Sequence, residues 1–181
     1  ELIADGKIVG WFQGKAEFGP RSLGARSICA DPRSMMSKLN INQLLKKRDW
    51  FMPYAPSMLE EEINDWLELP VESPYMQIAF KLKEDKSSLI PAGVHVDGST
   101  RVHTVSKKTN PLYWEMINCF KEKTGIPLVL NTSFNRHGIA TISTPYQAIH
   151  HLLEGCMDYL CIGDYLLKFE DIRKVSRDVG I

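Results

Sequence analysis

The chain has 181 residues, of which 44% are hydrophobic and 24% are charged, a composition typical of a globular protein with a substantial core. Its 22 Lys and Arg balance its 22 Asp and Glu, so the formal net charge is zero. This balance argues against nucleic acid as a main partner, because proteins that bind phosphate backbones usually carry a basic excess.

The first predicted element is a buried strand over Lys7–Gln13, where β-branched and aromatic residues are mixed. It leads into a loop of Gly and Pro that carries Arg21 and Arg26, and a short strand is expected over Ser27–Ala30. Residues 14–48 hold eight Lys or Arg against two acids, which is the composition of an anion site. The spacing is not that of a P-loop, and a solvated basic loop is the alternative.

A helix is predicted over Ser34–Lys46, and it brings Lys46 and Arg48 to the point where the chain leaves the helix. Cations that complement the helix dipole are the alternative interpretation of these two residues. Pro53 and Pro56 keep the next segment extended. The apolar face of the helix would comprise Met35, Leu39, Ile41, Leu44 and Leu45; beyond it we expect an extended segment over 51–59, a short acidic helix over 60–67 and a strand over 75–82.

The segment 92–105 alternates apolar and polar residues around an Asp-Gly pair, which predicts a β-hairpin. If residues 98–100 form its loop, the polar side chains would share one face of the hairpin. This cluster would either bind a ligand or form a plain polar outer face. Its members are His95, Asp97, Arg101 and His103.

Asn110 and Pro111 predict the start of a helix whose apolar stripe includes Tyr113 and Phe120 and which ends at Gly125. A buried strand is predicted over 127–130, and the small polar residues from Asn131 to Asn135 come directly after it. Open α/β sheets place ligand groups at such strand ends, although turn chemistry explains Asn and Ser equally well.

A capping box over Thr144–Gln147 predicts a last helix, which stops at Gly155. Strands over 159–162 and 165–169 and a charged tail complete the chain. Helices and strands interleave throughout, so the fold class is α/β or α+β around one mixed sheet.

The four cysteines form no CxxC pair, and we expect them to be reduced and buried rather than bound to zinc or paired in disulfides. No signal peptide or membrane span is visible, so we expect no membrane partner and a cytoplasmic location. The chain begins abruptly, with a helix end that runs straight into a strand. We therefore expect residues 1–181 to be one domain cut from a longer protein.

Four motifs follow one another along the chain: FGPRSLGARSICADPR, LNINQLLKKRDWFMPYAPSML, HVDGSTRV and the run GIPLVLNTSFN. With a looser match over residues 138–167, they closely resemble the carboxy-terminal domain of the carbamoyltransferases of nodulation-factor and antibiotic biosynthesis. That domain is similar to the YrdC proteins, so the resemblance implies a YrdC-like twisted mixed sheet flanked by helices.

YrdC-like sites are marked by a K-x-R pair and an S-x-N pair, which here are Lys46 with Arg48 and Ser133 with Asn135. The resemblance implies that these four residues bind ATP and a carbamate, and we add Asn131 from the same loop. Carbamoyl phosphate and its hydrolysis are assigned to Arg21, Arg26, His95 and Arg101; the predicted catalytic residues are Lys46, Arg48, Arg26 and His95.

Such domains, as the resemblance implies, convert carbamoyl phosphate and ATP to carbamoyl adenylate. A separate amino-terminal Kae1-like domain that carries iron would then move the carbamoyl group to a hydroxyl acceptor. We expect Mg²⁺ to accompany the ATP. We expect no metal site built from protein side chains, because the sequence contains no acidic cluster that would indicate one.

Three positions depart from the family pattern, and we expect those at Met52 and Ile139 to bear on substrate handling. Met52 stands where Arg is usual, His103 replaces a usual Gln, and Ile139-Ala140 replaces Glu-Pro. The alternatives to an enzyme that forms carbamoyl adenylate are a non-catalytic nucleotide-binding module, a threonylcarbamoyl adenylate synthase and an RNA-binding domain.

Overall fold

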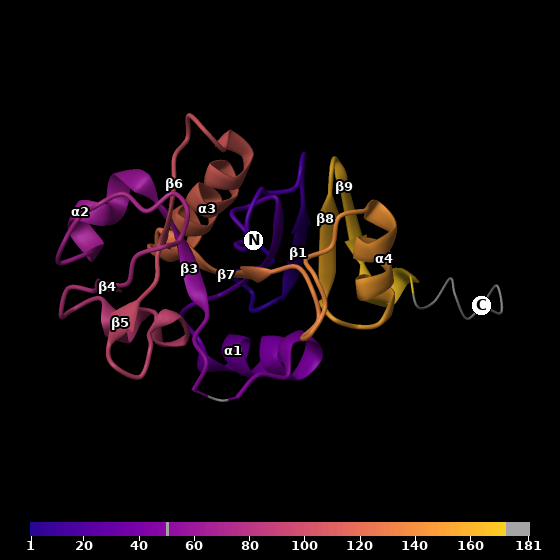
Figure 1. Ribbon diagram of the computed structural model, residues 1–181, viewed down its shortest axis with the longest axis horizontal. Coiled ribbons are helices and arrows are strands. Elements are labelled where there is room, and N and C mark those ends of the chain that lie inside the picture. The colour runs from indigo at the N-terminus through magenta and orange to yellow at the C-terminus, as the bar shows by residue number, and fades with distance from the viewer. Residues whose placement is uncertain (50, 173–181) are drawn as a thin grey trace.

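The computed structural model describes residues 1–49 and 51–172, and its centre is a seven-stranded mixed sheet in the order β6-β3-β7-β2-β1-β8-β9 (Figure 1). Pairs β1–β8 and β3–β6 are parallel, and the other neighbours are antiparallel. The predicted mixed sheet is therefore confirmed. Its strands are β1 Val9–Phe12, β2 Arg26–Ala30, β3 Ala55–Leu59, β6 His103–Val105, β7 Leu128–Ser133, β8 Tyr159–Ile162 and β9 Tyr165–Lys168.

Two helices, over residues 111–124 and 145–153, begin where their capping residues predict. The Asn110 side chain accepts from the backbone N–H of Tyr113, and the helix ends at Gly125, whose φ of 76° suits a residue without a Cβ. Thr144 and Gln147 form the predicted capping box. The helices are α1 Met35–Ile41, which continues as a π-helical segment over Asn42–Lys46, α2 Ile63–Trp66, α3 Pro111–Thr124 and α4 Pro145–Leu153.

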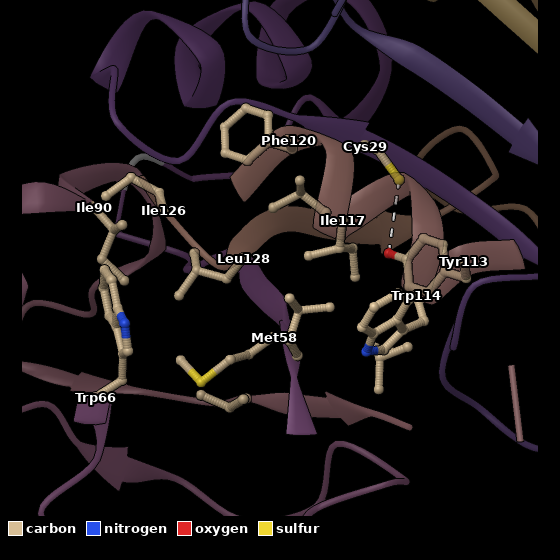
Figure 2. Packing of buried hydrophobic residues seen from close by; sticks show 14 of the residues in the cluster. Cys29, Met58, Trp66, Ile90, Tyr113, Trp114, Ile117, Phe120, Ile126 and Leu128 are labelled. Carbon is tan, nitrogen blue, oxygen red and sulfur yellow. Dashed lines mark hydrogen bonds between the residues drawn. The ribbon is translucent and has the colours of Figure 1, made fainter. Parts of the chain in front are cut away.

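Side chains that alternate along the strands build a core on each face of the sheet. On β1, Trp11 packs into the core under α3, whereas Phe12 packs into the core under α1 and α4. Figure 1 shows α3 and α1 on opposite sides of the central strands. In the α3 core, Tyr113 lies beside Cys29, with its hydroxyl 3.7 Å from the Cys29 sulfur (Figure 2).

Residues 14–26 form a loop that is fixed at both ends by buried polar contacts. The Trp11 indole N–H donates to the carbonyl of Gly24 at 3.0 Å. One carboxylate oxygen of Glu17 accepts from the backbone N–H groups of Leu23, Ala25 and Arg26 at 2.7, 2.8 and 3.1 Å. These contacts satisfy backbone donors that no strand would pair, so the loop has a defined shape.

The predicted hairpin over 92–105 is wrong. Residues 91–93 form a 3₁₀ turn, and the backbone N–H of His95 donates to the carbonyl of Ser99. The Asp97 carboxylate caps this turn through the N–H and hydroxyl of Ser99. Non-local pairing then prevails over local alternation: β5 Ser99–Thr100 pairs with β4 Phe80–Lys81, and β6 joins β3 in parallel.

Three other predictions need correction. The strand expected over 75–82 shrinks to β4, because the preceding residues turn, with Met76 at a φ of 54°. The helix over 34–46 buries Ile41 and Leu45 but leaves Met35, Leu39 and Leu44 exposed.

All four cysteines are free, and Cys119 is exposed rather than buried. Most of the charged tail, residues 173–181, lies outside the described residues.

Across residues 1–49 and 51–172 we find no helix that combines the length and the apolar character needed to cross a membrane.

Gly24 provides a direct test of how the loop is held against α3. Its φ is 91°, and an added Cβ would lie 2.3 Å from the Tyr113 ring, so Gly24→Ala combines backbone strain with overlap in the core. We expect it to lower the free energy of unfolding by about 2–4 kcal/mol in urea titrations. Gly138→Ala is the control, because its φ is 82° but nothing lies within 4 Å, and it should cost only about 1 kcal/mol. Equal losses would contradict this packing.

Candidate functional site

Three arginines converge on a small pocket at the carboxyl end of β7. The pocket has a volume of about 50 Å³, and Arg21, Arg48 and Arg101 line it together with residues of β7. Burial lowers the pKa of Arg101, and the positive charges of Arg21 and Arg48 lower it further. Within the described residues none of the three forms a salt bridge. We call this site the three-arginine pocket; its other lining residues are Pro20, Ser22, Pro53, Tyr54, Ala55, Met76, Asn131, Thr132 and Ser133.

The chain turns at the end of the π-helical segment, and this turn lies between Lys46 and Arg48. Lys47 adopts the left-handed conformation with a φ of 45° and turns the chain between its neighbours. Asn42 then holds Arg48 through its backbone: the Asn42 side chain accepts from the Arg48 N–H at 2.7 Å and donates to the Arg48 carbonyl at 2.6 Å. Lys46 can therefore enter the protein interior while Arg48 lines the pocket.

Lys46 joins the two predicted pairs into one unit. The residue is 1% exposed, and its ammonium donates to both residues of the S-x-N pair. The distances from Lys46 Nζ are 2.6 Å to the Ser133 carbonyl, 3.0 Å to Ser133 Oγ, 2.8 Å to the Asn135 carbonyl and 2.7 Å to Asn135 Oδ1. Burial, followed by the nearby charge of Arg48, lowers the pKa of Lys46 to about 7.

The floor of the pocket contains polar atoms without partners. Arg101 Nε, Ser22 Oγ and Asn131 Oδ1 are buried and make no hydrogen bond within the described structure. Such atoms are rare in folded proteins, because an unpaired buried polar group is destabilising. The pocket therefore presents both donors and an acceptor to an occupant.

A wider cleft adjoins the three-arginine pocket. It has a volume of about 380 Å³ and shares Arg21, Arg101 and Met76 with the pocket. Exposed Phe18 and Tyr75 line its outer part. Met76 is buried and holds a positive φ, so a strained backbone lies where the two spaces meet.

The structure brings most of the predicted site residues together: Arg21, Arg48, Arg101, Asn131 and Ser133 line one pocket, and Lys46 and Asn135 adjoin it through Ser133.

Arg26 and His95 do not line the pocket. The Arg26 guanidinium donates to the carbonyls of Gln13, Gly14 and Ala25 at 3.0 Å and lies over the Phe12 ring. His95 bonds to Ser99, and its pKa is lowered by burial and by Arg101 and Lys38, while Asp97 opposes that shift. The hydrogen bonds of both side chains are therefore made within the protein, outside the three-arginine pocket.

Sequence reasoning missed the buried residues that support the pocket. Ser22 lies inside the first family motif, and Ser57 lies inside the second, in a segment predicted only as extended chain; neither residue carries a separate signal. His103 was expected beside His95; instead its Nδ1 lies 2.8 Å from Ser57 Oγ. The pairing of β3 with β6 and β7 brings Ser57 and His103 together beside Asn131.

The chemistry of the pocket does not suit a protein-built metal site. Its lining residues include no carboxylate, and no group of three or more His, Cys, Asp or Glu elsewhere in the described chain could hold a metal ion. Guanidinium groups and neutral polar groups favour an anion. Any magnesium that accompanies a nucleotide would depend on nucleotide oxygens and water.

Residues 1–168 match the family described as "Carbamoyltransferase C-terminus". The chain belongs to this family. It is 46% identical to nodulation protein NolNO of Sinorhizobium fredii over 171 residues, covering 93% of this chain and 25% of that protein. Identity to nodulation protein NolO of Bradyrhizobium diazoefficiens is 44% over 171 residues, covering 93% of this chain and 31% of that protein. This carbamoyltransferase domain thus spans about a quarter to a third of these relatives.

Two solved structures share the fold of the carbamoyltransferase domain. Full-length HypF in its phosphate- and nucleotide-bound form matches with a TM-score of 0.58 and 15% identity, over 89% of this chain and 20% of that chain. The H234A/Y235A variant of P. abyssi Sua5 matches with a TM-score of 0.53 and 15% identity, over 90% of this chain and 43% of that chain. The YrdC-like fold class is confirmed by these likenesses.

The buried ammonium predicts a specific pH dependence of stability. The folded-state pKa of Lys46, about 7, lies below its ordinary value of 10.5, so the unfolded chain binds more protons between these values. The contribution of Lys46 therefore makes the protein more stable as pH rises from 7 towards 10, by at most about 1.4 kcal/mol per pH unit. Urea unfolding of the wild type and Lys46→Met should show this difference. Lys47→Met removes an exposed charge, and its free energy of unfolding should change with pH as that of the wild type does. The prediction would be contradicted if the free energies of unfolding of wild type and Lys46→Met differed by the same amount at every pH.

Proposed function

We propose that this carbamoyltransferase domain forms carbamoyl adenylate from carbamoyl phosphate and ATP. The observation that carries the proposal is the three-arginine pocket, which concentrates positive charge without an internal counter-ion beside the Lys46 unit. An anionic substrate would supply the missing negative charge. The resemblance in fold to HypF, whose structure contains phosphate and nucleotide, supports a site for both kinds of ligand.

The proposed reaction has two steps. Water breaks the bond between the carbamoyl group and phosphate, which releases inorganic phosphate and a carbamate. A carbamate oxygen then attacks the α-phosphorus of ATP, and pyrophosphate leaves with the electrons of the broken bond. Both steps bring anions together, so the protein contributes chiefly by alignment and by stabilising negative charge.

The proposed roles follow the placement of the charges. Arg21 and Arg101 bind carbamoyl phosphate in the pocket, and Arg48 lies where the carbamate and the α-phosphate of ATP meet. Arg26 acts through the shape of the loop, because its guanidinium is bound to loop carbonyls. His95 is our candidate for assisting hydrolysis, since it is held near Arg101 and its lowered pKa favours the neutral, proton-accepting ring.

Lys46 has a different role before and after nucleotide binding. In the free chain the Lys46 ammonium donates its hydrogen bonds to Ser133 and Asn135, so it orders the S-x-N turn. We propose that the phosphates of ATP draw the ammonium away from some of these acceptors and raise its pKa. Lys46 then stabilises charge on the transferred α-phosphate, while Ser133 and Asn135 bind the nucleotide.

Transfer to the acceptor belongs to the rest of the protein under this proposal. A Kae1-like amino-terminal domain with iron would receive carbamoyl adenylate and pass its carbamoyl group to a hydroxyl. The relatives are three to four times longer than the matched region, which leaves room for such a domain.

A non-catalytic nucleotide-binding module is the second candidate function. The observation in its favour is the saturated Lys46 ammonium, whose four oxygen neighbours already compensate its charge. Binding of ATP without turnover would then be the whole role of this domain.

Pyrophosphate release decides between the two functions. With ATP, Mg²⁺ and carbamoyl phosphate, we expect the purified chain to give at least a stoichiometric burst of pyrophosphate that requires carbamoyl phosphate. Lys46→Ala should abolish the burst, whereas Lys47→Ala, which removes an exposed neighbouring charge, should retain it. If the folded chain binds ATP but releases no pyrophosphate, the result would contradict catalysis by this chain alone and favour the binding module.

A substitution at Arg101 should affect the binding of carbamoyl phosphate more than the binding of ATP. We expect Arg101→Gln to weaken carbamoyl phosphate binding about tenfold or more, because a charge-assisted bond is lost, and to change ATP affinity less than about threefold. Calorimetric titration with each ligand measures both effects. Lys15→Gln is the matched control, since it removes the same charge from an exposed position outside the pocket. If both variants weakened binding equally, net charge rather than the pocket would be responsible.

A further inference from the structure

Unpaired polar atoms concentrate in the three-arginine pocket. Six buried side-chain atoms lack a hydrogen-bond partner within residues 1–49 and 51–172, and three of them belong to residues that line this pocket. They are Ser22 Oγ, Arg101 Nε and Asn131 Oδ1. Native proteins pair most buried polar groups, so this concentration points to a ligand with complementary groups.

The orientation of the Asn131 amide is fixed by its neighbours. Its Nδ2 donates to the Ser22 carbonyl and to Ser57 Oγ, both at 2.8 Å. A backbone carbonyl only accepts hydrogen bonds, so the atom beside it must be the amide nitrogen and cannot be the oxygen. Ser57 is itself held by His103 Nδ1. Asn131 Oδ1 is therefore a preorganised acceptor, 2% exposed as a residue and left for an occupant of the pocket.

An acceptor is unusual among the groups that this pocket offers. The three arginines supply donors, which suit phosphate and carbonyl oxygens. Asn131 Oδ1 can pair only with an N–H or O–H of the ligand. The pocket thus complements a small molecule that combines anionic and carbonyl oxygens with a neutral N–H or O–H donor.

We propose that Asn131 Oδ1 accepts a hydrogen bond from the amino group of the carbamoyl moiety and so selects carbamoyl phosphate over other acyl phosphates. The inference rests on the proposed function for the identity of the substrate, and it adds the residue that sets specificity. Arg101 Nε faces the ligand's oxygens, and Ser57 positions Asn131 without touching the ligand. An acyl phosphate with a methyl in place of the amino group would leave Asn131 Oδ1 buried and unpaired.

The test is equilibrium binding without ATP, using two stable analogues. Phosphonoacetamide mimics carbamoyl phosphate, and acetonylphosphonate replaces its amino group with methyl. We expect the wild type to prefer phosphonoacetamide at least tenfold in calorimetric titrations. Asn131→Leu should reduce the preference to about twofold or less while binding inorganic phosphate within about threefold of the wild type. Ser57→Ala should reduce the preference partly, because Asn131 loses one of its two anchors.

Equal binding of the two analogues by the wild type, or an unchanged preference in Asn131→Leu, would overturn the inference. Should Asn131→Leu not fold, the wild-type comparison and Ser57→Ala decide the matter. A structural role for Asn131 would weaken all three ligands together and leave the preference intact. Because no turnover is measured, a failure of pyrophosphate release would count against the proposed function alone.

Discussion

The buried contact between Lys46 and the S-x-N turn is the interaction on which the site depends. It ties the end of the π-helical segment to the end of β7, two parts of the chain that are 87 residues apart in sequence. No carboxylate is among its partners, so neutral oxygens alone offset the cost of removing an ammonium from water. The K-x-R and S-x-N pairs are consequently one structural unit, and a change in either pair alters the other.

Positive charge in the pocket is left for a ligand because the nearby acid is engaged elsewhere. Glu17 is the one carboxylate in the loop that carries Arg21, and it accepts from three backbone N–H groups. A carboxylate paired with the pocket arginines would stabilise the free chain and compete with the substrate. The loop thus uses its negative charge to hold its own shape, and the arginines remain available to an anion.

Sequence patterns predicted those parts of the fold that depend on local chemistry. Asn110 and Thr144 cap their helices as expected, because a capping side chain bonds within its own first turn. The hairpin over 92–105 failed because β6 gains more by pairing with β3 than its residues gain from a local turn. The family motifs selected Arg21, Arg48 and Arg101, but assigned Arg48 to ATP and the other two to carbamoyl phosphate; the structure brings all three to one pocket. The orientation of Asn131 depends on Ser57 in the neighbouring strand, and no local sequence pattern indicates it.

The side chains at the three departures from the family pattern lie outside the hydrogen bonds of Lys46. Burial lowers the pKa of His103 to about 4, so the ring is neutral at pH 7 and, like a glutamine amide, offers Ser57 a neutral polar contact without adding charge. At position 139 the site uses the backbone, since the Ile139 carbonyl accepts from Asn135 Nδ2, and many side chains would serve. Met52 is partly exposed and does not line the three-arginine pocket. Each departure therefore leaves unchanged the four oxygens that hold the Lys46 ammonium.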